Sequence, residues 1–110
     1  MINISSRSEG TATVVQVGGR IDADTAPGFE YACLQLVRGG EKVVVLDLGG
    51  VQYISSAGLR SLLVIGKEQQ GRGGVLRLAN LTPIVGRVFE QSGFHSLFPC
   101  FDSVEKAAEG

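Results

Sequence analysis

Runs of β-branched and apolar residues alternate along the chain with stretches of helical periodicity. Residues 2–4 alternate apolar and polar side chains and residues 11–17 read TATVVQV, so we predict two short strands joined by a hairpin at Glu9-Gly10. Residues 42–48 read KVVVLDL and are apolar on both faces, as expected of the central strand of a sheet that helices cover. Weaker patterns predict strands at 75–79 and, at the edge of the sheet, at 94–98.

Apolar residues at helical spacing predict helices between these strands. One stripe predicts a helix over 25–38, with Asp24 as its N-cap and Gly39-Gly40 at its end. A second stripe predicts a helix over 57–70, with Ser61 among the residues on the side away from the core.

Two further helices begin at recognisable caps. Thr82 and Pro83 suit the N-cap and first position of a helix that Gly93 ends, and Asp102 with Glu105 resembles a capping box for a short last helix. The order of elements is therefore β-β-α-β-α-β-α-β-α. It predicts a single α/β domain over 1–110, with a mixed, mostly parallel sheet of about four to five strands and helices packed around it.

Composition narrows the class of protein. The 110 residues, 44% of them hydrophobic, build one small domain and exclude a multidomain enzyme. The formal net charge of −1 and the scattered basic residues lack the basic patch of a protein that binds nucleic acid or a membrane surface. The opening MINISSRSEG has no apolar run of a secretory signal, so we expect a cytoplasmic protein. The 16 glycines include the pairs 18–19 and 49–50, which we interpret as loop residues.

The reactive side chains indicate no catalytic, metal or cofactor site. Cys33 and Cys100 match no metal-ligand spacing and are interpreted as free thiols. His95 is the only histidine, which favours a surface or strand-end residue over a ligand or a member of a catalytic triad. Residues 71–74 read GRGG with no Lys-Ser or Lys-Thr after them, so they predict a turn and not a phosphate-binding loop.

Two adjacent serines stand where the most buried strand leads into the second helix. Ligands and modification sites of α/β sheets gather beyond the carboxyl ends of the strands, so this segment is the candidate site. Whichever of Ser55 and Ser56 caps the helix, the other lies in its first turn, where free N–H groups favour an anion such as a phosphoryl group. The simpler alternative is that both serve only as capping residues. A nucleophilic serine is disfavoured, because the GxSxG motif and a base are missing.

Residues 46–59 resemble the signature of the STAS domain of bacterial anti-sigma factor antagonists, the partner-switching family. In that signature a buried strand and an aromatic residue, here Tyr53, precede Asp-Ser-(Ser/Thr/Ala)-Gly-Leu at the start of a helix. Residues 19–22, GRID, are similar to the family's Gly-x-(Leu/Ile)-Asp segment, and residues 84–94 resemble its late helix and Gly-Phe ending. The resemblance covers essentially the whole chain.

The resemblance implies a phosphorylation site and its partners. In that family a serine is phosphorylated by a partner that is both serine kinase and anti-sigma factor, and a metal-dependent serine/threonine phosphatase removes the phosphate. The motif places this serine at Ser56, with Ser55 as second choice, and matches Asp22 to an acidic residue near the site. Ser55 stands where many members have Asp, which bears on kinase preference, and Ala57 removes a competing acceptor.

The resemblance further implies an anti-sigma factor antagonist that is not an enzyme. The unphosphorylated form would dock the anti-sigma factor and free its sigma factor, and the phosphate would oppose docking by its charge beside Asp22. From their places on the predicted helix, Arg60 would contact the partner, neutralise the phosphate or simply be solvated. Val64 projects away from the core, where it would contact a partner or be an ordinary exposed apolar residue. No nucleic acid or membrane partner is expected, and the chain is expected to be a monomer or a weak dimer. The predicted partner-binding residues are Asp22, Ser55, Ser56, Ala57, Gly58, Arg60 and Val64.

Three other functions stay open. The chain could be the STAS regulatory subunit of another system, such as a lipid ABC transporter, a stress-sensing complex or a two-component-like phosphorelay. It could be a small nucleotide-binding protein or enzyme, against which the missing phosphate loop, metal-ligand cluster and base for Ser56 argue. A purely structural protein would have no partner at all.

Overall fold

Five strands form one sheet, in which they lie in the order in which they follow along the chain. The computed structural model describes residues 2–110. The first two strands pair antiparallel and all others parallel, which confirms the mixed, mostly parallel sheet and places the predicted buried strand at its centre. The strands are β1 (Ile2–Glu9), β2 (Ala12–Ile21), β3 (Val43–Ile54), β4 (Val75–Ala79) and β5 (Cys100–Phe101).

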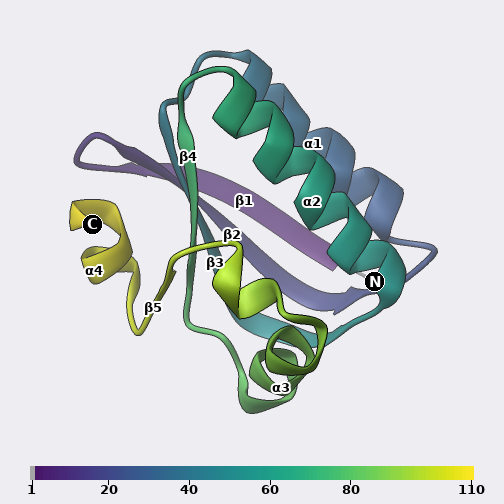
Figure 1. The fold of residues 1–110 in the computed structure, drawn as a ribbon. Coiled ribbons are helices and arrows are strands. Elements are labelled where there is room, and N and C mark those ends of the chain that lie inside the picture. The colour runs from purple at the N-terminus through teal and green to yellow at the C-terminus, as the bar shows by residue number, and fades with distance from the viewer. Residues whose placement is uncertain (1) are drawn as a thin grey trace.

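Helices cover the two faces of the sheet unequally. Figure 1 shows α1 and α2 side by side over one face, with α3 near the end of that layer and α4 apart from them. The larger core lies beneath the first three helices and holds Phe29, Leu46 and Phe89, all fully buried. The smaller core lies on the other face and joins α4 to β2, β3 and β4. The helices are α1 (Ala26–Arg38), α2 (Ser56–Gly71), α3 (Pro83–Ser92) and α4 (Val104–Glu109).

Strands β2 and β3 run further than their patterns predict. The glycine pairs 18–19 and 49–50 lie inside these strands, so their prediction as loops is wrong. The physical reason is close approach of two chains, since Gly18 pairs with Gly50 and a Cβ on Gly50 would lie 3.2 Å from the Gly18 Cα. The segment that was expected to be a loop after residue 48 is therefore strand up to Ile54.

The predicted edge strand at 94–98 is also wrong. Gly93 adopts φ 80° and ends α3 as expected, but the chain then turns into a short 3-10 helix, Phe94–Ser96. Phe94 is buried, and its ring centroid lies 5.9 Å from that of Phe89, which holds the turn against the core. The true edge strand is β5, a few residues later, and it pairs with β4.

Three predicted helix details differ in the structure. The N-cap of α1 is Thr25 and not Asp24, and that of α4 is Ser103 and not Asp102. The hydroxyl of Ser103 accepts a hydrogen bond from the Lys106 N–H at 3.1 Å, which explains its place. Ser61 is 3% exposed and faces α1, not solvent. The Thr82 cap and the Pro83 start of α3 are confirmed.

Cys33 is buried and Cys100 exposed, and both are free, as predicted. Burial raises the pKa of the Cys33 thiol to about 12, so this side chain behaves as an apolar core residue. None of the helices within residues 2–110 has the length and apolar character needed to span a membrane.

Candidate functional site

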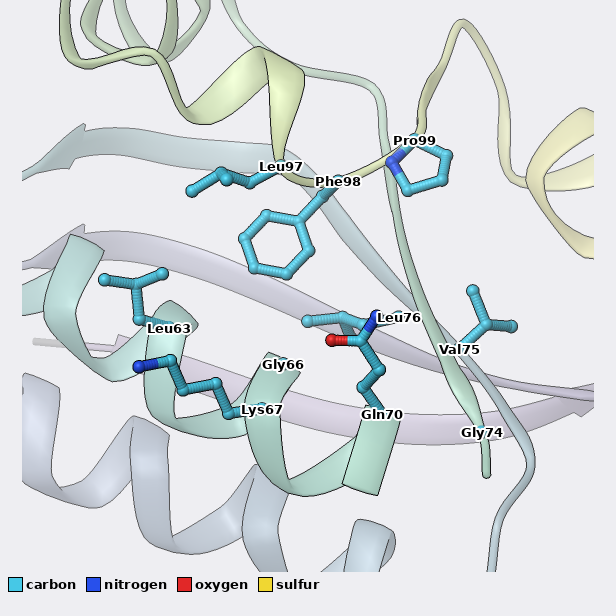
Figure 2. A pocket seen from close by; sticks show the side chains of 10 residues that line it. All are labelled: Leu63, Gly66, Lys67, Gln70, Gly74, Val75, Leu76, Leu97, Phe98 and Pro99. Carbon is cyan, nitrogen blue, oxygen red and sulfur yellow. The ribbon is translucent and has the colours of Figure 1, made fainter. Parts of the chain in front are cut away.

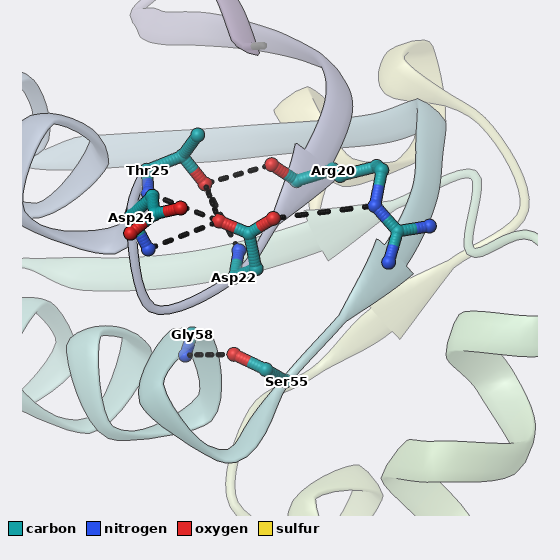
Figure 3. A network of polar contacts seen from close by, with 6 residues as sticks. All are labelled: Arg20, Asp22, Asp24, Thr25, Ser55 and Gly58. Carbon is teal, nitrogen blue, oxygen red and sulfur yellow. Dashed lines mark hydrogen bonds and ion pairs between the residues drawn. The ribbon is translucent and has the colours of Figure 1, made fainter.

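The two adjacent serines have different roles at the start of α2. Ser55 is the N-cap, with extended backbone at φ −93° and ψ 175°, and its hydroxyl accepts a hydrogen bond from the Gly58 N–H at 3.3 Å (Figure 3). Ser56 follows as the first residue of the helix and is exposed, and its hydroxyl takes no part in the cap. The sequence left open which serine caps the helix, and the structure assigns that role to Ser55.

Gly58 sets how closely α2 approaches the ends of two strands. A Cβ at this position would lie 2.7 Å from Ile54 Cγ1 and 2.8 Å from Ile21 Cγ2, so any side chain here would force these two buried isoleucines to move. Gly58 is buried and does not lie on the surface. Its role is to let the first turn of α2, which carries the exposed Ser56, pack closely on the strand ends.

The loop from β2 to α1 is held by the carboxylate of Asp22. Its Oδ1 accepts hydrogen bonds from the N–H groups of Asp24 and Thr25, both at 3.1 Å, and the Thr25 hydroxyl donates to the Arg20 carbonyl at 2.7 Å (Figure 3). The Thr25 N–H is the main reason that the pKa of Asp22 lies below its ordinary value. The other carboxylate oxygen lies 4.0 Å from the Arg20 Nε. Asp22 is therefore ionised at neutral pH and fixes the shape of the loop.

Backbone hydrogen bonding ties this loop to the serines. The Ser55 N–H donates to the Ile21 carbonyl at 2.8 Å, so the start of α2 and the residue before Asp22 are directly joined. Beside them the Arg20 guanidinium lies over the Tyr53 ring, 4.4 Å from its centroid. The acidic loop and the serine segment thus form one hydrogen-bonded edge at the carboxyl ends of β2 and β3.

A shallow groove of about 780 Å³ runs between α1 and α2 and includes the exposed serine. Ser56, Ala57 and Arg60 line it from α2, and Glu30 and Tyr31 line it from α1. The buried Ser61 hydroxyl donates to Glu30 Oε1 at 3.0 Å and holds that wall in place. The groove therefore contains charges of both signs beside the free hydroxyl.

The family model of the STAS domain matches residues 3–107. The chain belongs to the STAS domain family. Within this family it is similar to anti-sigma factor antagonists, which are regulatory proteins.

Two relatives and one solved structure illustrate the similarity of this STAS domain. The chain is 46% identical over 90 residues to BtrV of Bordetella bronchiseptica, provisionally named an anti-sigma factor antagonist, and the match covers 82% of this chain and 78% of that protein. It is 25% identical over 104 residues to the anti-sigma-B factor antagonist of Staphylococcus aureus, covering 94% and 96%. The crystal structure of an anti-sigma factor antagonist from Mycobacterium paratuberculosis has a TM-score of 0.90 and 26% identity, covering 99% of this chain and 92% of that one.

The predicted site residues of this STAS domain differ in their solvent exposure. Ser56 and Arg60 are exposed, and Val64, one turn after Arg60, is 37% exposed. Ser55, Ala57 and Asp22 are half-buried and Gly58 is buried.

Sequence reasoning missed three features near this site. Tyr31 is 67% exposed beside the groove, and its only signal is that an aromatic residue lies off the apolar stripe of the predicted helix. Thr25 was overlooked as the partner of Asp22, although Asp and Thr three residues apart before a helix form a recognisable turn pattern. The stacking of Arg20 on Tyr53 has no signal in the sequence, because it depends on an irregular register between β2 and β3.

Proposed function

We propose that this STAS domain is a phosphorylation-controlled antagonist of an anti-sigma factor. The unphosphorylated chain binds an anti-sigma factor that is also a serine kinase, and so releases the sigma factor that this partner holds. Phosphorylation of Ser56 switches the chain off, and a metal-dependent serine/threonine phosphatase restores it. All of these steps take place in the cytoplasm.

The division of roles between the two serines carries the proposal. The Ser55 hydroxyl accepts a hydrogen bond in the helix cap, and its backbone N–H is bonded to Ile21. A kinase acting on Ser55 would therefore have to break the cap. Ser56 is exposed at the next position, outside the cap, and is available without unfolding the helix. This difference supports Ser56 as the acceptor.

The first turn of α2 suits a phosphate group. Free backbone N–H groups and the positive end of the helix dipole stabilise an anion there by about 0.3–1 kcal/mol. Arg60 lies one turn later on the same helix, at the spacing that brings two side chains together. Phosphorylation is therefore expected to leave the fold intact.

The phosphate would change the surface that the partner recognises. It adds close to two negative charges beside the rigid loop that Asp22 holds in its ionised form. Two like charges in one desolvated interface oppose docking, so the partner would dissociate without any large change of shape in this chain.

Mapping the phosphorylated residue tests the proposal. The chain would be incubated with ATP and the anti-sigma factor captured on its unphosphorylated form, and the products analysed by mass spectrometry. We expect Ser56→Ala to receive no phosphate. Ser55→Asp is the matched control, because aspartate also caps a helix well and should leave Ser56 a substrate. Phosphate on the Ser56→Ala variant at the wild-type level would refute the assignment.

A further inference from the structure

A second cleft lies along the later turns of α2, away from the serines (Figure 2). Its volume is about 370 Å³, which is within the size range of small-molecule sites. Leu63 of α2, Leu76 of β4 and Phe98 of the segment before β5 supply apolar walls. Figure 2 shows the Phe98 ring directed into the space between that segment and α2.

A glycine determines the shape of this cleft. A Cβ on Gly66 would lie 2.4 Å from Phe98 Cε1, so the ring rests directly on the backbone of α2. The neighbouring Leu97 is 55% exposed, although most leucines of the fold are buried or half-buried. Leu63, Leu76 and Phe98 already belong to the core or pack against it. The cleft therefore adds an uncovered apolar surface at the edge of that core.

Lys67 is the only charged side chain that lines the cleft among residues 2–110, and the Gln70 amide offers both a donor and an acceptor. Lys67 and Gln70 stand one turn apart on α2, and no carboxylate lines the cleft among residues 2–110. Lys67 makes no ion pair within the described part of the chain, and the adjacent Glu68 pairs instead with Arg38 and Arg72 at 3.5 and 3.0 Å. The groove at Ser56 differs, since Glu30 and Arg60 supply charges of both signs there. An uncompensated ammonium group beside an apolar cleft is complementary to an apolar anion.

We propose that this cleft binds an apolar molecule with a single anionic head group, such as a medium-chain carboxylate. The apolar body lies against Leu63, Leu76 and Phe98, and the carboxylate pairs with the Lys67 ammonium group, which Figure 2 shows beside Leu63. Burial of the hydrocarbon provides most of the affinity, and Lys67 selects the anion over a neutral molecule. The proposal does not depend on phosphorylation of Ser56.

The test titrates the full ¹⁵N-labelled chain with decanoate and, separately, with decanol, both below their aggregation limits, and follows the amide signals by NMR. We expect saturable shifts of residues 63–70 and 97–99, with decanoate binding about fivefold more tightly than decanol. Lys67→Met should remove that preference, and Lys67→Arg should restore it. Lys106→Met is the matched control, because Lys106 is an exposed lysine on α4, and it should bind decanoate like the wild type.

Each contrary result overturns the proposal. No saturable binding of decanoate would mean that the cleft receives no small amphiphile, as would be the case if it accepts only an apolar side chain of a partner protein. Equal affinity for decanoate and decanol, or an unchanged affinity of Lys67→Met for decanoate, would remove the role of the charge. Shifts centred on residues 56–60 would place the ligand in the other groove. Because exposed Lys67 is outside the core, its variants should fold normally.

Discussion

The first turn of α2 is held mainly by hydrogen bonds, whereas its later turns pack mainly against apolar side chains. The first turn is surrounded by hydrogen bonds, from the Ser55 cap to the loop that Asp22 holds, and it presents a free hydroxyl at Ser56. Further along, Gly66 and Leu63 face apolar side chains, and Lys67 is the charged side chain at the rim of the adjoining cleft. Each region contains one glycine on which a neighbouring side chain rests closely.

This difference suggests why a switch would be placed at the first turn. A charge added there meets helix N–H groups and solvent, so the chemistry of the surface changes while the core does not. A charge fixed on the apolar wall of the cleft, at Gly66 for example, would lie against Phe98 and Leu76 and away from Lys67 at the rim, and would cost the free energy of desolvation. The predictions below test whether the first turn of α2 is tightly packed and capped, and whether its stability is unaffected by changes at Ser56.

The largest expected effect comes from the two glycines of α2 that another side chain contacts closely, Gly58 and Gly66. Gly58→Ala should lower the free energy of unfolding by about 2 kcal/mol, because the new methyl group overlaps buried Ile54 and Ile21. Gly66→Ala should cost less than about 1 kcal/mol, since the overlapping atoms are the far end of the Phe98 ring beside an open cleft. Urea unfolding of the variants measures both.

Gly86→Ala provides the control for these two variants. It lies in α3 with no atom within 4 Å of the added methyl group, so it should raise stability by about 0.5–1 kcal/mol through helix propensity alone. Equal changes in stability for Gly58→Ala and Gly86→Ala would show that the start of α2 is not tightly packed.

A smaller effect should separate the two serines. Ser55→Ala removes the capping oxygen and should cost about 1 kcal/mol of unfolding free energy, whereas Ser55→Asn, which keeps a capping oxygen, should cost little. Ser56→Ala should change stability by less than about 0.5 kcal/mol, because Ser56 is exposed and outside the cap. Thermal and urea unfolding measure these differences. If Ser56→Ala cost as much as Ser55→Ala, both serines would contribute to the cap.

The smallest effect is a pH dependence at Asp22. The folded state lowers the pKa of this carboxyl group, so its contribution to stability is present above the pKa of the unfolded chain and is lost as the pH falls through the lowered value. Asp22→Asn should therefore be less stable than the wild type at pH 7. We expect the difference to shrink on acidification, in urea unfolding curves between pH 7 and pH 2. A difference that stayed constant over this range would exclude ionised Asp22 as the group that holds the loop.

The sequence predicts the fold where a pattern has one physical meaning. The short, mostly apolar run of β4 and the Thr82-Pro83 start of α3 occur at the predicted residues, since local preference and tertiary packing agree there. Glycine is ambiguous, because it serves both turns and close approach. Gly49-Gly50 lies inside a strand because two backbones approach closely there. The sequence alone does not show that Gly18 is the neighbour of Gly50.

The candidate site was predictable in part for the same reason. The adjacent serines before a helix are a local signal, and their position at the carboxyl end of the central strand follows from the order of elements. The choice of Ser55 as the cap depends on backbone angles, and the groove beside Ser56 depends on how α1 packs on α2. Neither property is encoded in a short stretch of sequence. Only the structure therefore places Tyr31 and Glu30 in the groove beside Ser56.

A phosphate on Ser56 should end the interaction with the anti-sigma factor while the fold stays unchanged. Calorimetric titration of that partner with the unphosphorylated chain and with the chain phosphorylated only at Ser56 tests it directly. We predict a loss of about 2–4 kcal/mol in binding free energy, which is about 30- to 1,000-fold in affinity, with superimposable circular dichroism spectra. Equal affinity of the two forms would refute phosphorylation of Ser56 as the switch that ends binding.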